Sequence, residues 1–332
     1  MSSEPLGVGL VGAGQMGRIH AANLAAGRIS GARLAAVADA DAAVAGACAA
    51  EHDVPALSVG SLVNDDGVRA IVIASPGNTH AGIIETAARV GKHVFTEKPL
   101  DTDLGRIDRA LSAVREARVA LQVGFNRRFD ANFARVREAV SAGRVGDPYV
   151  LHIISRDPVW RVPPVIDGLS GLLFDTTIHD FDMCRHLVGD VESVYVLGAP
   201  AVHKADVPDT ITVSLRFANG ALGLIENGQA VFGYDQRLEL FGSNGAVRVD
   251  NEHPDRVPAA DREGVHSPLP QAFYAQRYAA SYVAELQAFV DCIRDGAEPP
   301  VSGADGRAAV VIALAAQRSL DEGRPVRVDE IS

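Results

Sequence analysis

The chain has 332 residues, of which 47% are hydrophobic and 22% charged, which is typical of a globular protein long enough for two domains. The net charge of −11 disfavours binding to nucleic acid or anionic membranes, and no apolar run approaches the roughly 18 residues that span a bilayer. The N-terminal residues lack the positive region of a signal peptide. Cys48, Cys184 and Cys292 are widely spaced and best explained as reduced, packed thiols, so we expect a cytoplasmic protein.

A glycine-rich turn near the N-terminus is the first functional motif. It follows an apolar run, Leu6 to Val11, that predicts a buried strand, and it precedes a helical run from Arg18 to Ala26. In this context Gly12 allows the tight turn, Gly14 lets a pyrophosphate approach the backbone, and Gly17 lets the helix pack closely on the strand. The motif predicts a dinucleotide bound at the N-terminus of the helix.

An acidic residue after the second predicted strand, 33–38, indicates which dinucleotide binds. Asp39 lies 25 residues after Gly14, where a carboxylate accepts hydrogen bonds from the adenosine ribose and repels a 2′-phosphate. Asp41 and the absence of a nearby arginine also favour NAD over NADP. The alternative is that Asp39 only caps the next helix.

Strands and helices then alternate in a way that predicts a doubly wound parallel sheet of the Rossmann type. The expected elements are strands 70–74, 93–96 and 120–125 and helices 79–90 and 103–118. Ligands of such sheets bind beyond the carboxyl ends of the strands, where residues 75–78 and 97–99 fall. His80 either belongs to this site or is an ordinary residue of a first helical turn. The predicted cofactor-binding residues are Gly12, Gly14, Gln15, Met16, Gly17, Asp39, Ser75, Pro76, Asn78, His80, Glu97 and Lys98.

After Asn126 the pattern changes to that of an antiparallel sheet. Asn219-Gly220 and Asn244-Gly245 are hairpin signals between alternating runs. The segment from Asp250 to Pro270, rich in proline and charge, predicts a long loop. The expected strands are 149–155, 191–197, 210–217, 221–228, 236–241 and 246–249, and the expected helices are 127–142, 278–294 and 303–322.

Another helix, predicted over 172–188, carries a carboxylate and an imidazole. Asp175 and His179 are spaced i, i+4 and therefore project from one helix face. Such a pair is either functional or an ordinary surface interaction. Asp182, Cys184 and His186 follow, but the five positions scatter around the helix without a CxxC or HExxH motif, so we expect no metal. The residues expected on the buried side are Phe174, Ile178, Phe181 and Leu187.

Taken together, these motifs resemble the Gfo/Idh/MocA oxidoreductases over essentially the whole chain. The resemblance rests on the glycine turn, Ser75 to His80, Gly91 to Pro99, and the helix that carries Asp175 and His179. Further stretches are similar to the inositol 2-dehydrogenase branch of that family. These stretches are 124–130 (GFNRRFD), 155–158 (SRDP), 177–183 (TIHDFDM), 305–307 (DGR) and 319–325.

The resemblance implies an NAD-binding Rossmann domain over residues 1–126 and a second domain over residues 127–332. The second is expected to be an α+β domain for substrate binding and oligomerisation, whose open, mostly antiparallel sheet builds dimers or tetramers. The implied catalytic residues are Lys98, Asp175 and His179. The implied substrate-binding residues are Lys98, Asn126, Arg127, Asp157, Asp175, His179, Tyr234 and Tyr282, although Tyr234 is alternatively a simple turn residue.

The predicted function is oxidation of a secondary alcohol of a cyclic polyol by hydride transfer to NAD, converting myo-inositol to 2-keto-myo-inositol. His179 is expected to act as the base, because an imidazole titrates near neutral pH, while Lys98 stabilises the developing alkoxide and Asp175 orients the substrate or the imidazole. Pro99 is expected to hold the lysine through a cis peptide bond. Glu97 either pairs with the lysine or anchors the turn.

Several alternatives remain open within this resemblance. They are another inositol isomer, a pyranose such as glucose, a non-catalytic NAD-binding sensor, and an oxidoreductase whose cofactor stays bound. Ser170-Gly171, Phe174 and the segment Val159 to Asp167, which contains Trp160, depart from the branch pattern, and that segment is expected to border the substrate. We expect a small-molecule partner, with no nucleic acid and no membrane.

Overall fold

The computed structural model describes residues 4–159, 171–202, 208–230 and 232–331. The chain forms two compact units, one of residues 1–129 with 280–310 and one of residues 130–279 with 311–332. The predicted boundary after residue 126 lies close to this division. Residues 280–310, which the sequence analysis assigned to the second domain, pack with the first unit instead. The assignment of two functional domains stays a prediction, and each unit is described by itself.

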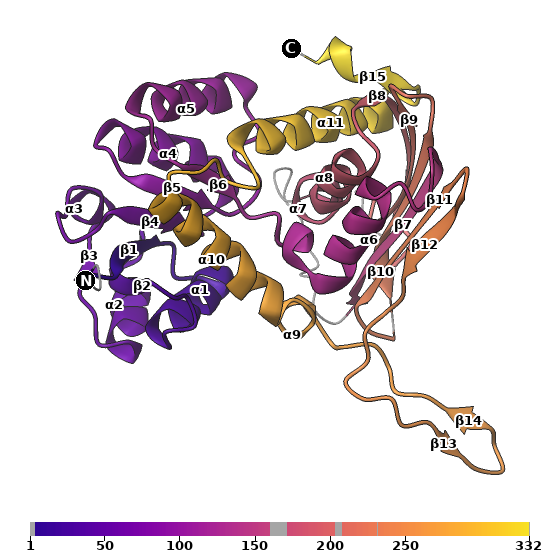
Figure 1. Cartoon of the computed structure of the whole chain (residues 1–332), viewed down its shortest axis with the longest axis horizontal. Helices are drawn as coiled ribbons and strands as arrows, with labels where there is room; N and C mark the ends of the chain where they lie inside the picture. Colours follow the sequence, from indigo (N-terminus) through magenta and orange to yellow (C-terminus); the bar gives the residue numbers. More distant parts are fainter. Residues whose placement is uncertain (1–3, 160–170, 203–207, 231, 332) are drawn as a thin grey trace. The chain divides into compact units, whose positions relative to one another are not determined.

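The described part of the first unit contains a parallel sheet in the order β3-β2-β1-β4-β5-β6, the order of a doubly wound dinucleotide-binding fold. Helices α1, α2 and α10 lie on one face, and α4 and α5 lie on the other (Figure 1). The elements are β1 (Leu6–Val11), α1 (Gln15–Ala25), β2 (Ala32–Ala38), α2 (Ala42–Glu51), β3 (Ala56–Leu57), α3 (Val59–Val63), β4 (Ala70–Ile73), η1 (Gly77–Thr79), α4 (His80–Arg89), β5 (His93–Thr96), α5 (Leu104–Ala117), β6 (Leu121–Val123), η2 (Asn126–Phe129), most of α10 (Ala279–Asp295) and the first part of α11 (Gly303–Glu322).

The core of this unit explains why a late segment of the chain belongs to it. Leu10 and Val37 from the sheet and Leu24 from α1 share one hydrophobic cluster with Leu286 and Phe289 from α10. Burial of each such side chain contributes roughly 1.5–3 kcal/mol to stability. Helix α10 is therefore an integral part of the nucleotide-binding unit.

The described part of the second unit is built on a sheet in the order β12-β11-β7-β10-β9-β8-β15, antiparallel except where β10 pairs with β7. Helices α6, α7, α8 and the later part of α11 lie beside one face of this sheet (Figure 1). The elements are α6 (Ala131–Ser141), β7 (Pro148–Pro158), α7 (Leu172–Asp175), α8 (Thr177–Leu187), β8 (Val191–Ala199), β9 (Thr210–Phe217), β10 (Leu222–Ala230), β11 (Asp235–Gly242), β12 (Gly245–Val249), β13 (Ala259–Ala260), β14 (Val265–His266), α9 (Tyr274–Arg277), the rest of α11, β15 (Val326–Arg327) and η4 (Val328–Glu330). The predicted fold class, a Rossmann sheet plus a mostly antiparallel sheet, is confirmed.

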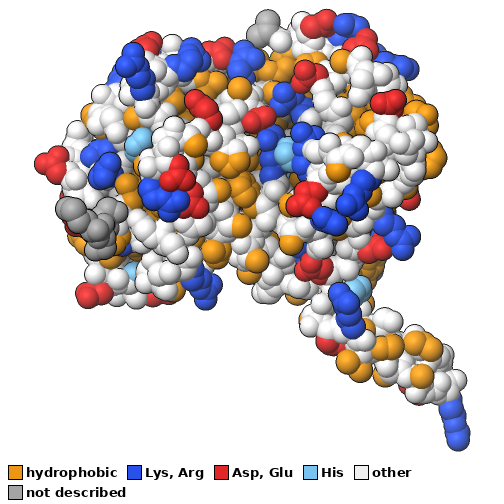
Figure 2. All heavy atoms as spheres, viewed as in Figure 1, with side chains coloured by type: hydrophobic (Ala, Val, Ile, Leu, Met, Phe, Trp, Pro, Cys, Tyr) orange, Lys and Arg blue, Asp and Glu red, His pale blue; other side chains and the backbone are white. Residues whose placement is uncertain are grey.

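Two local features differ from the sequence prediction. The predicted helix over 172–188 is interrupted at Thr176, whose φ of −105° lies outside the usual helical value, so Asp175 ends α7 and His179 lies in α8. The predicted loop 250–270 contains the short hairpin β13–β14, which projects from the second unit. Exposed apolar side chains lie along this projection (Figure 2), namely Val257, Val265 and Leu269. Among the described residues, no helix has the length and apolar character required to cross a membrane.

Candidate active site

The glycine turn has the geometry that its predicted roles require. Gly12 has a φ of +95°, in the region that favours glycine, and a Cβ placed on it would lie 2.4 Å from the Ser75 backbone nitrogen. A Cβ on Gly17 would lie 1.9 Å from the Gly12 carbonyl oxygen, so α1 packs against the turn without room for a side chain. A Cβ on Gly14 would instead meet nothing within 4 Å. The turn is therefore closed behind and open at Gly14, which leaves the N-terminus of α1 accessible to a pyrophosphate.

Asp39 is fixed against this turn, and its neighbour Asp41 performs the helix-capping role. The Asp39 carboxylate accepts hydrogen bonds from the backbone nitrogens of Ala13 (2.7 Å) and Asp41 (2.9 Å). The Asp41 carboxylate accepts from the Ala43 backbone nitrogen at 2.8 Å and caps α2. The capping alternative therefore applies to Asp41, and Asp39 stands half-buried at the carboxyl end of β2. These residues fit a bound NAD, because the open turn leaves room for its phosphates and the Asp39 carboxylate is a suitable acceptor for ribose hydroxyls.

Lys98 lies between two residues that are each anchored by a buried histidine. On one side, His20 of α1 has its Nε2 2.8 Å from Oε1 of Glu97. On the other side, His80 has its Nδ1 2.7 Å from the carbonyl oxygen of Pro99. The expected cis peptide bond joins Lys98 to Pro99. Glu97 is thus tied to α1 through His20, and its pairing with Lys98 stays a prediction.

His80 ties together the two loops in which cofactor-binding residues were predicted. Its Nε2 lies 2.7 Å from the carbonyl oxygen of Ser75, so the ring bridges the loop after β4 and the turn after β5. Burial lowers the pKa of His80, and the backbone hydrogen bonds to Ser75 and Pro99 oppose that effect. The ring is 1% exposed, and both ring nitrogens face protein carbonyls. Direct contact of His80, Pro76 and Asn78 with the cofactor stays a prediction.

Besides Lys98, three predicted substrate-binding residues belong to the first unit. Asn126 is buried, and its Nδ2 lies 3.3 Å from the Ser281 hydroxyl of α10. Arg127 is 4% exposed and Tyr282 is 5% exposed. The Tyr282 ring stands edge-on to His20, with ring centroids 6.2 Å apart. Tyr282 thus lies on α10 and Asn126 contacts it, although α10 belongs to the part of the chain that was predicted to form the other domain.

In the second unit, two hydrogen-bonded anchors hold the segment that carries Asp175 and His179. The Ser155 hydroxyl on β7 donates to the buried Asp180 carboxylate at 2.7 Å. Thr176 donates through Oγ1 to Oδ1 of Asn227 on β10, at 3.2 Å. Each anchor is directly next to one predicted catalytic residue in the chain. The segment is thereby fastened to two adjacent strands, with Asp175 exposed and His179 half-buried.

The predicted residues Asp157 and Tyr234 lie at one end of this sheet. Their chain neighbours Arg156 and Asp235 pair across β7 and β11 and form an ion pair at 2.6 Å. Burial alone would raise the pKa of Asp235, but hydrogen bonds from Arg237 and Asn251 and the charges of Arg237 and Arg156 lower it overall. Asp235 is thus a structural ion-pair centre.

Tyr234 packs edge-on against Phe273 and Tyr278, with centroids 6.3 and 6.0 Å apart, so it is more than a turn residue. The described residues do not include Ser170 or most of the segment that was expected to border the substrate, namely positions 160–167, which contain Trp160. The predicted buried residues of the helical segment are confirmed in Phe174, Ile178, Phe181 and Leu187.

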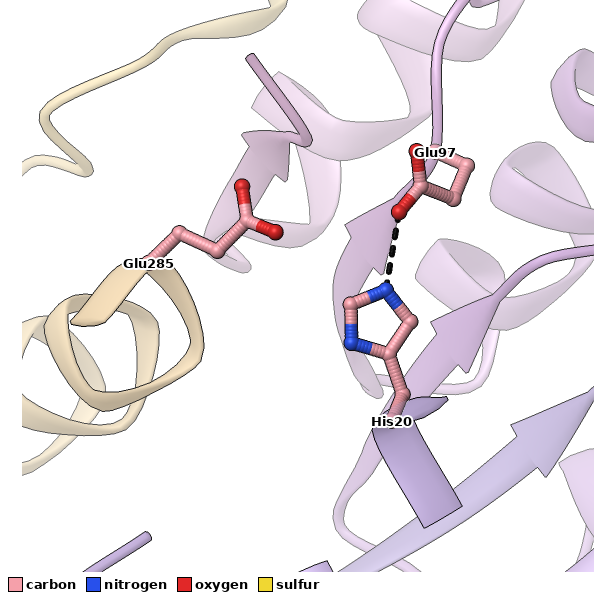
Figure 3. Close-up of side chains that lie close together, drawn as sticks. All are labelled: His20, Glu97 and Glu285. Atoms are coloured by element: carbon pink, nitrogen blue, oxygen red, sulfur yellow. Dashed lines mark hydrogen bonds and ion pairs between the residues drawn. The ribbon is translucent and has the colours of Figure 1, made fainter. Parts of the chain in front are cut away.

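One buried cluster of titratable side chains was not predicted from the sequence. Among the described residues, the side chains grouped closely enough to hold a metal ion are His20, Glu97 and Glu285, whose ligand atoms lie within 4.8 Å of one another. Figure 3 shows the Glu285 carboxyl directed toward the His20–Glu97 pair. The position of His20 near the glycine turn could have been inferred from the sequence, because His20 lies only three residues after Gly17. Glu285 had no such signal, because it comes from a distant helix.

Comparison with known proteins agrees with this architecture. Residues 6–125 match the family model described as "Oxidoreductase family, NAD-binding Rossmann fold", and residues 133–248 match the "GFO/IDH/MocA C-terminal domain". A myo-inositol 2-dehydrogenase of Thermotoga maritima is 40% identical over 98% of this chain and 99% of its own length. An inositol 2-dehydrogenase of Rhizobium meliloti is 40% identical over 96% of this chain and 98% of its own.

A solved structure supports the same conclusion. The scyllo-inositol dehydrogenase of Lactobacillus casei, with bound NAD(H) and scyllo-inositol, has a TM-score of 0.91 at 27% identity and covers 98% of this chain and 99% of its own. Both halves of the chain thus match one family, and the glycine turn and Asp39 provide the features of its NAD site. The chain belongs to the Gfo/Idh/MocA family of NAD-dependent oxidoreductases.

Proposed function

We propose that this NAD-dependent oxidoreductase oxidises a secondary alcohol of a cyclic polyol, with myo-inositol as the substrate and 2-keto-myo-inositol as the product. The observation that carries the proposal is the 40% identity, over nearly the full length of both chains, to relatives named inositol 2-dehydrogenase. The glycine turn and Asp39 provide the cofactor half of this chemistry.

The proposed roles follow from what alcohol oxidation requires. When NAD is bound, it accepts the hydride that leaves the carbinol carbon. His179 takes the hydroxyl proton, since a group that titrates near neutral pH is an efficient base. The Lys98 ammonium stabilises the negative charge that develops on the substrate oxygen, and Asp175 orients the substrate or the imidazole. Asn126, Arg127, Asp157, Tyr234 and Tyr282 are the proposed partners of the remaining hydroxyls.

A second candidate substrate is scyllo-inositol. The observation in its favour is the similarity to the Lactobacillus casei scyllo-inositol dehydrogenase, although the identity to it, 27%, is lower than that to the relatives named for myo-inositol or inositol. The two isomers differ in the orientation of one hydroxyl, so a direct comparison of kcat/KM for both decides between them.

The role of Lys98 is tested by the variant Lys98→Ala. We expect turnover to fall by roughly a hundredfold or more while NAD binding is retained, because only an interaction made in the transition state is lost. Steady-state kinetics and fluorescence titration with NAD measure the two quantities. Turnover close to that of the wild type would overturn the catalytic role of this lysine.

We further propose that the enzyme is a homo-oligomer that associates through the outer face of the second unit's sheet. The support is apolar surface on that face that no described part of the chain covers: Leu222 and Leu224 of β10 are 45% and 47% exposed, and Phe241 of β11 is 52% exposed. Large exposed apolar patches of this kind mark association surfaces.

We also propose that the enzyme acts in the cytoplasm. The support is the state of its cysteines, because Cys48, Cys184 and Cys292 are all free and buried. A chain without disulfides suits a reducing compartment.

A further inference from the structure

The buried cluster of His20, Glu97 and Glu285 lies behind the turn that carries Lys98. Three separate elements of the first unit contribute to it: α1, the end of β5, and α10. His20 and Glu285 are fully buried and Glu97 is 8% exposed. In Figure 3 the Glu285 side chain extends from α10 toward the hydrogen-bonded His20–Glu97 pair. Two carboxyl groups and one imidazole therefore share a space that is closed to bulk solvent.

Several buried polar atoms of this cluster have no hydrogen-bond partner among the described residues. His20 Nε2 and Glu97 Oε1 are hydrogen-bonded, whereas His20 Nδ1 and both carboxyl oxygens of Glu285 have no hydrogen-bond partner among the described residues. Gln122 of β6 donates through Nε2 to the Glu285 backbone carbonyl at 2.7 Å, and its own Oε1 is also buried without a partner among the described residues. Buried polar atoms in native proteins are normally paired, so this gap is a place for a shared proton or a bridging water.

The cluster is closely packed, which disfavours ionised side chains within it. The His20 ring stands edge-on to Phe95, with centroids 5.4 Å apart, and a Cβ on Gly124 would lie 3.2 Å from Oε2 of Glu97. The titratable groups near Glu285 are His20 from α1, Glu97 from the end of β5 and Tyr282 on α10 itself. Lys98 follows Glu97 in the chain, and the residue that β6 places beside Glu285 is the neutral Gln122. Two adjacent carboxylates buried with one imidazole are strongly disfavoured unless one of them is neutral.

We propose that Glu285 is a positioning residue for Lys98 and works as a neutral carboxylic acid, leaving a single negative charge on Glu97, held by His20. The inference rests on the proposed catalytic role of Lys98. Glu97 and Pro99 are the two neighbours of Lys98, and a buried histidine anchors each of them. A second negative charge beside Glu97 would repel its carboxylate, draw water into the cluster and loosen the turn.

The direction of the Glu285 titration agrees with this arrangement. Burial raises the pKa of Glu285 well above its usual range, and the nearby charge of Glu97 raises it further. The buried carboxyl therefore keeps its proton to a higher pH than an exposed glutamate does, and loses it as the pH rises through the folded-state pKa. Since that pKa is raised above the unfolded-state value, the protonated carboxyl contributes its full stability below the unfolded-state pKa, and this contribution is lost as the pH rises through the folded-state pKa.

The variant Glu285→Gln mimics the neutral acid and tests the proposal. We expect kcat at neutral pH within about twofold of the wild type, and a smaller loss of activity toward alkaline pH than in the wild type. Infrared spectroscopy gives a readout independent of turnover: the wild type shows the carbonyl stretch of a protonated carboxyl at neutral pH, and this band is absent in Glu285→Gln. The matched control is Asp291→Asn, which also replaces a carboxylate with its amide but at a partly exposed position of the same helix. This control should leave the band in place.

Three outcomes would overturn the proposal. They are an infrared spectrum without the protonated carboxyl that Glu285→Gln removes, a more than tenfold loss of kcat in Glu285→Gln at neutral pH, and a stoichiometric divalent metal in the wild type that the variant lacks. If Glu285→Gln does not fold, Glu285→Met supplies a second uncharged side chain of similar length. An enzyme without turnover of any polyol would refute the proposed function, yet the infrared band would still decide the protonation of Glu285.

Discussion

At the scale of single residues, two neighbouring aspartates show how identical chemistry is divided between function and stability. Asp39 is bound to the glycine turn through the Ala13 backbone nitrogen, whereas Asp41 caps α2. The sequence alone left the capping role of Asp39 open, because both carboxylates precede the same helix. The hydrogen-bond geometry separates them, because Asp41 caps α2 and Asp39 does not, and ribose binding by Asp39 stays a prediction.

The two aspartates are expected to respond differently to substitution. Asp39→Asn removes the charge that repels a 2′-phosphate, so kcat/KM with NAD should fall by about tenfold or more and the preference for NAD over NADP should shrink. Asp41→Ala removes the cap and should cost about 1 kcal/mol of stability without changing cofactor preference. Kinetics with both cofactors and denaturant titrations measure these effects. A loss of NAD preference in Asp41→Ala instead would contradict the assignment.

The residues that could be predicted were those whose role is local. The glycines of the turn, the Lys98–Pro99 pair and the buried side of the 172–188 segment follow from short spacings and were found in the sequence. Glu285 was missed because its partners His20 and Glu97 come from distant parts of the chain. No short-range pattern signals a contact of that kind.

At the scale of elements, the strand–turn–helix unit β1–α1 is governed by how closely its backbone packs. Gly17 has no space for a side chain, whereas Gly14 faces open space with a φ of −69° that other residues also adopt. The two glycines are therefore needed for different reasons, one for folding and the other for the ligand.

This difference gives a matched pair of variants. Gly14→Ala should leave the melting temperature nearly unchanged and raise the KM for NAD by roughly tenfold or more, because the methyl group occupies the space of the pyrophosphate. Gly17→Ala should destabilise the protein by about 2 kcal/mol or more, because its methyl group collides with the Gly12 carbonyl. Thermal unfolding without cofactor and NAD kinetics distinguish the two. Equal destabilisation in both variants would refute this reading of the turn.

Most long elements could be predicted, and the failures have identifiable causes. The helix α2 was expected only as the helix that follows Asp39, and no pattern predicted β3 and α3, of which β3 is only two residues long and too short to show alternation. The helical periodicity of the sequence could not predict the break at Thr176, because Thr176 forms a tertiary hydrogen bond with Asn227 on β10. The β13–β14 hairpin lies in a stretch whose proline and charge content indicated only a loop.

At the scale of the whole molecule, the exposed apolar face of the second sheet is the feature that a single chain leaves unexplained. Leu222 and Leu224 alternate with the buried Gly223 and Ile225 on β10, so the first half of the strand is apolar on both faces. A strand that served only one core would carry polar side chains on the other face. This pattern supports association with a second copy of the chain.

The oligomer prediction is tested with Leu224→Lys. The charge should disrupt the proposed interface and shift the sedimentation coefficient toward that of a monomer, while the circular dichroism spectrum stays that of the wild type. Val90→Lys is the matched control, because Val90 is 45% exposed but belongs to the first unit. A wild-type protein that sediments as a monomer would contradict the proposal directly.

The central claim, NAD-dependent oxidation of an inositol, is tested most directly by NADH formation from a small panel of substrates. The purified protein is assayed with myo-inositol, scyllo-inositol, D-chiro-inositol, glucose, galactose and xylose, each with NAD and with NADP. We predict the highest kcat/KM for myo-inositol with NAD and little turnover with NADP. Turnover of an aldose alone, or no turnover of any compound by protein that still binds NAD, would contradict the account.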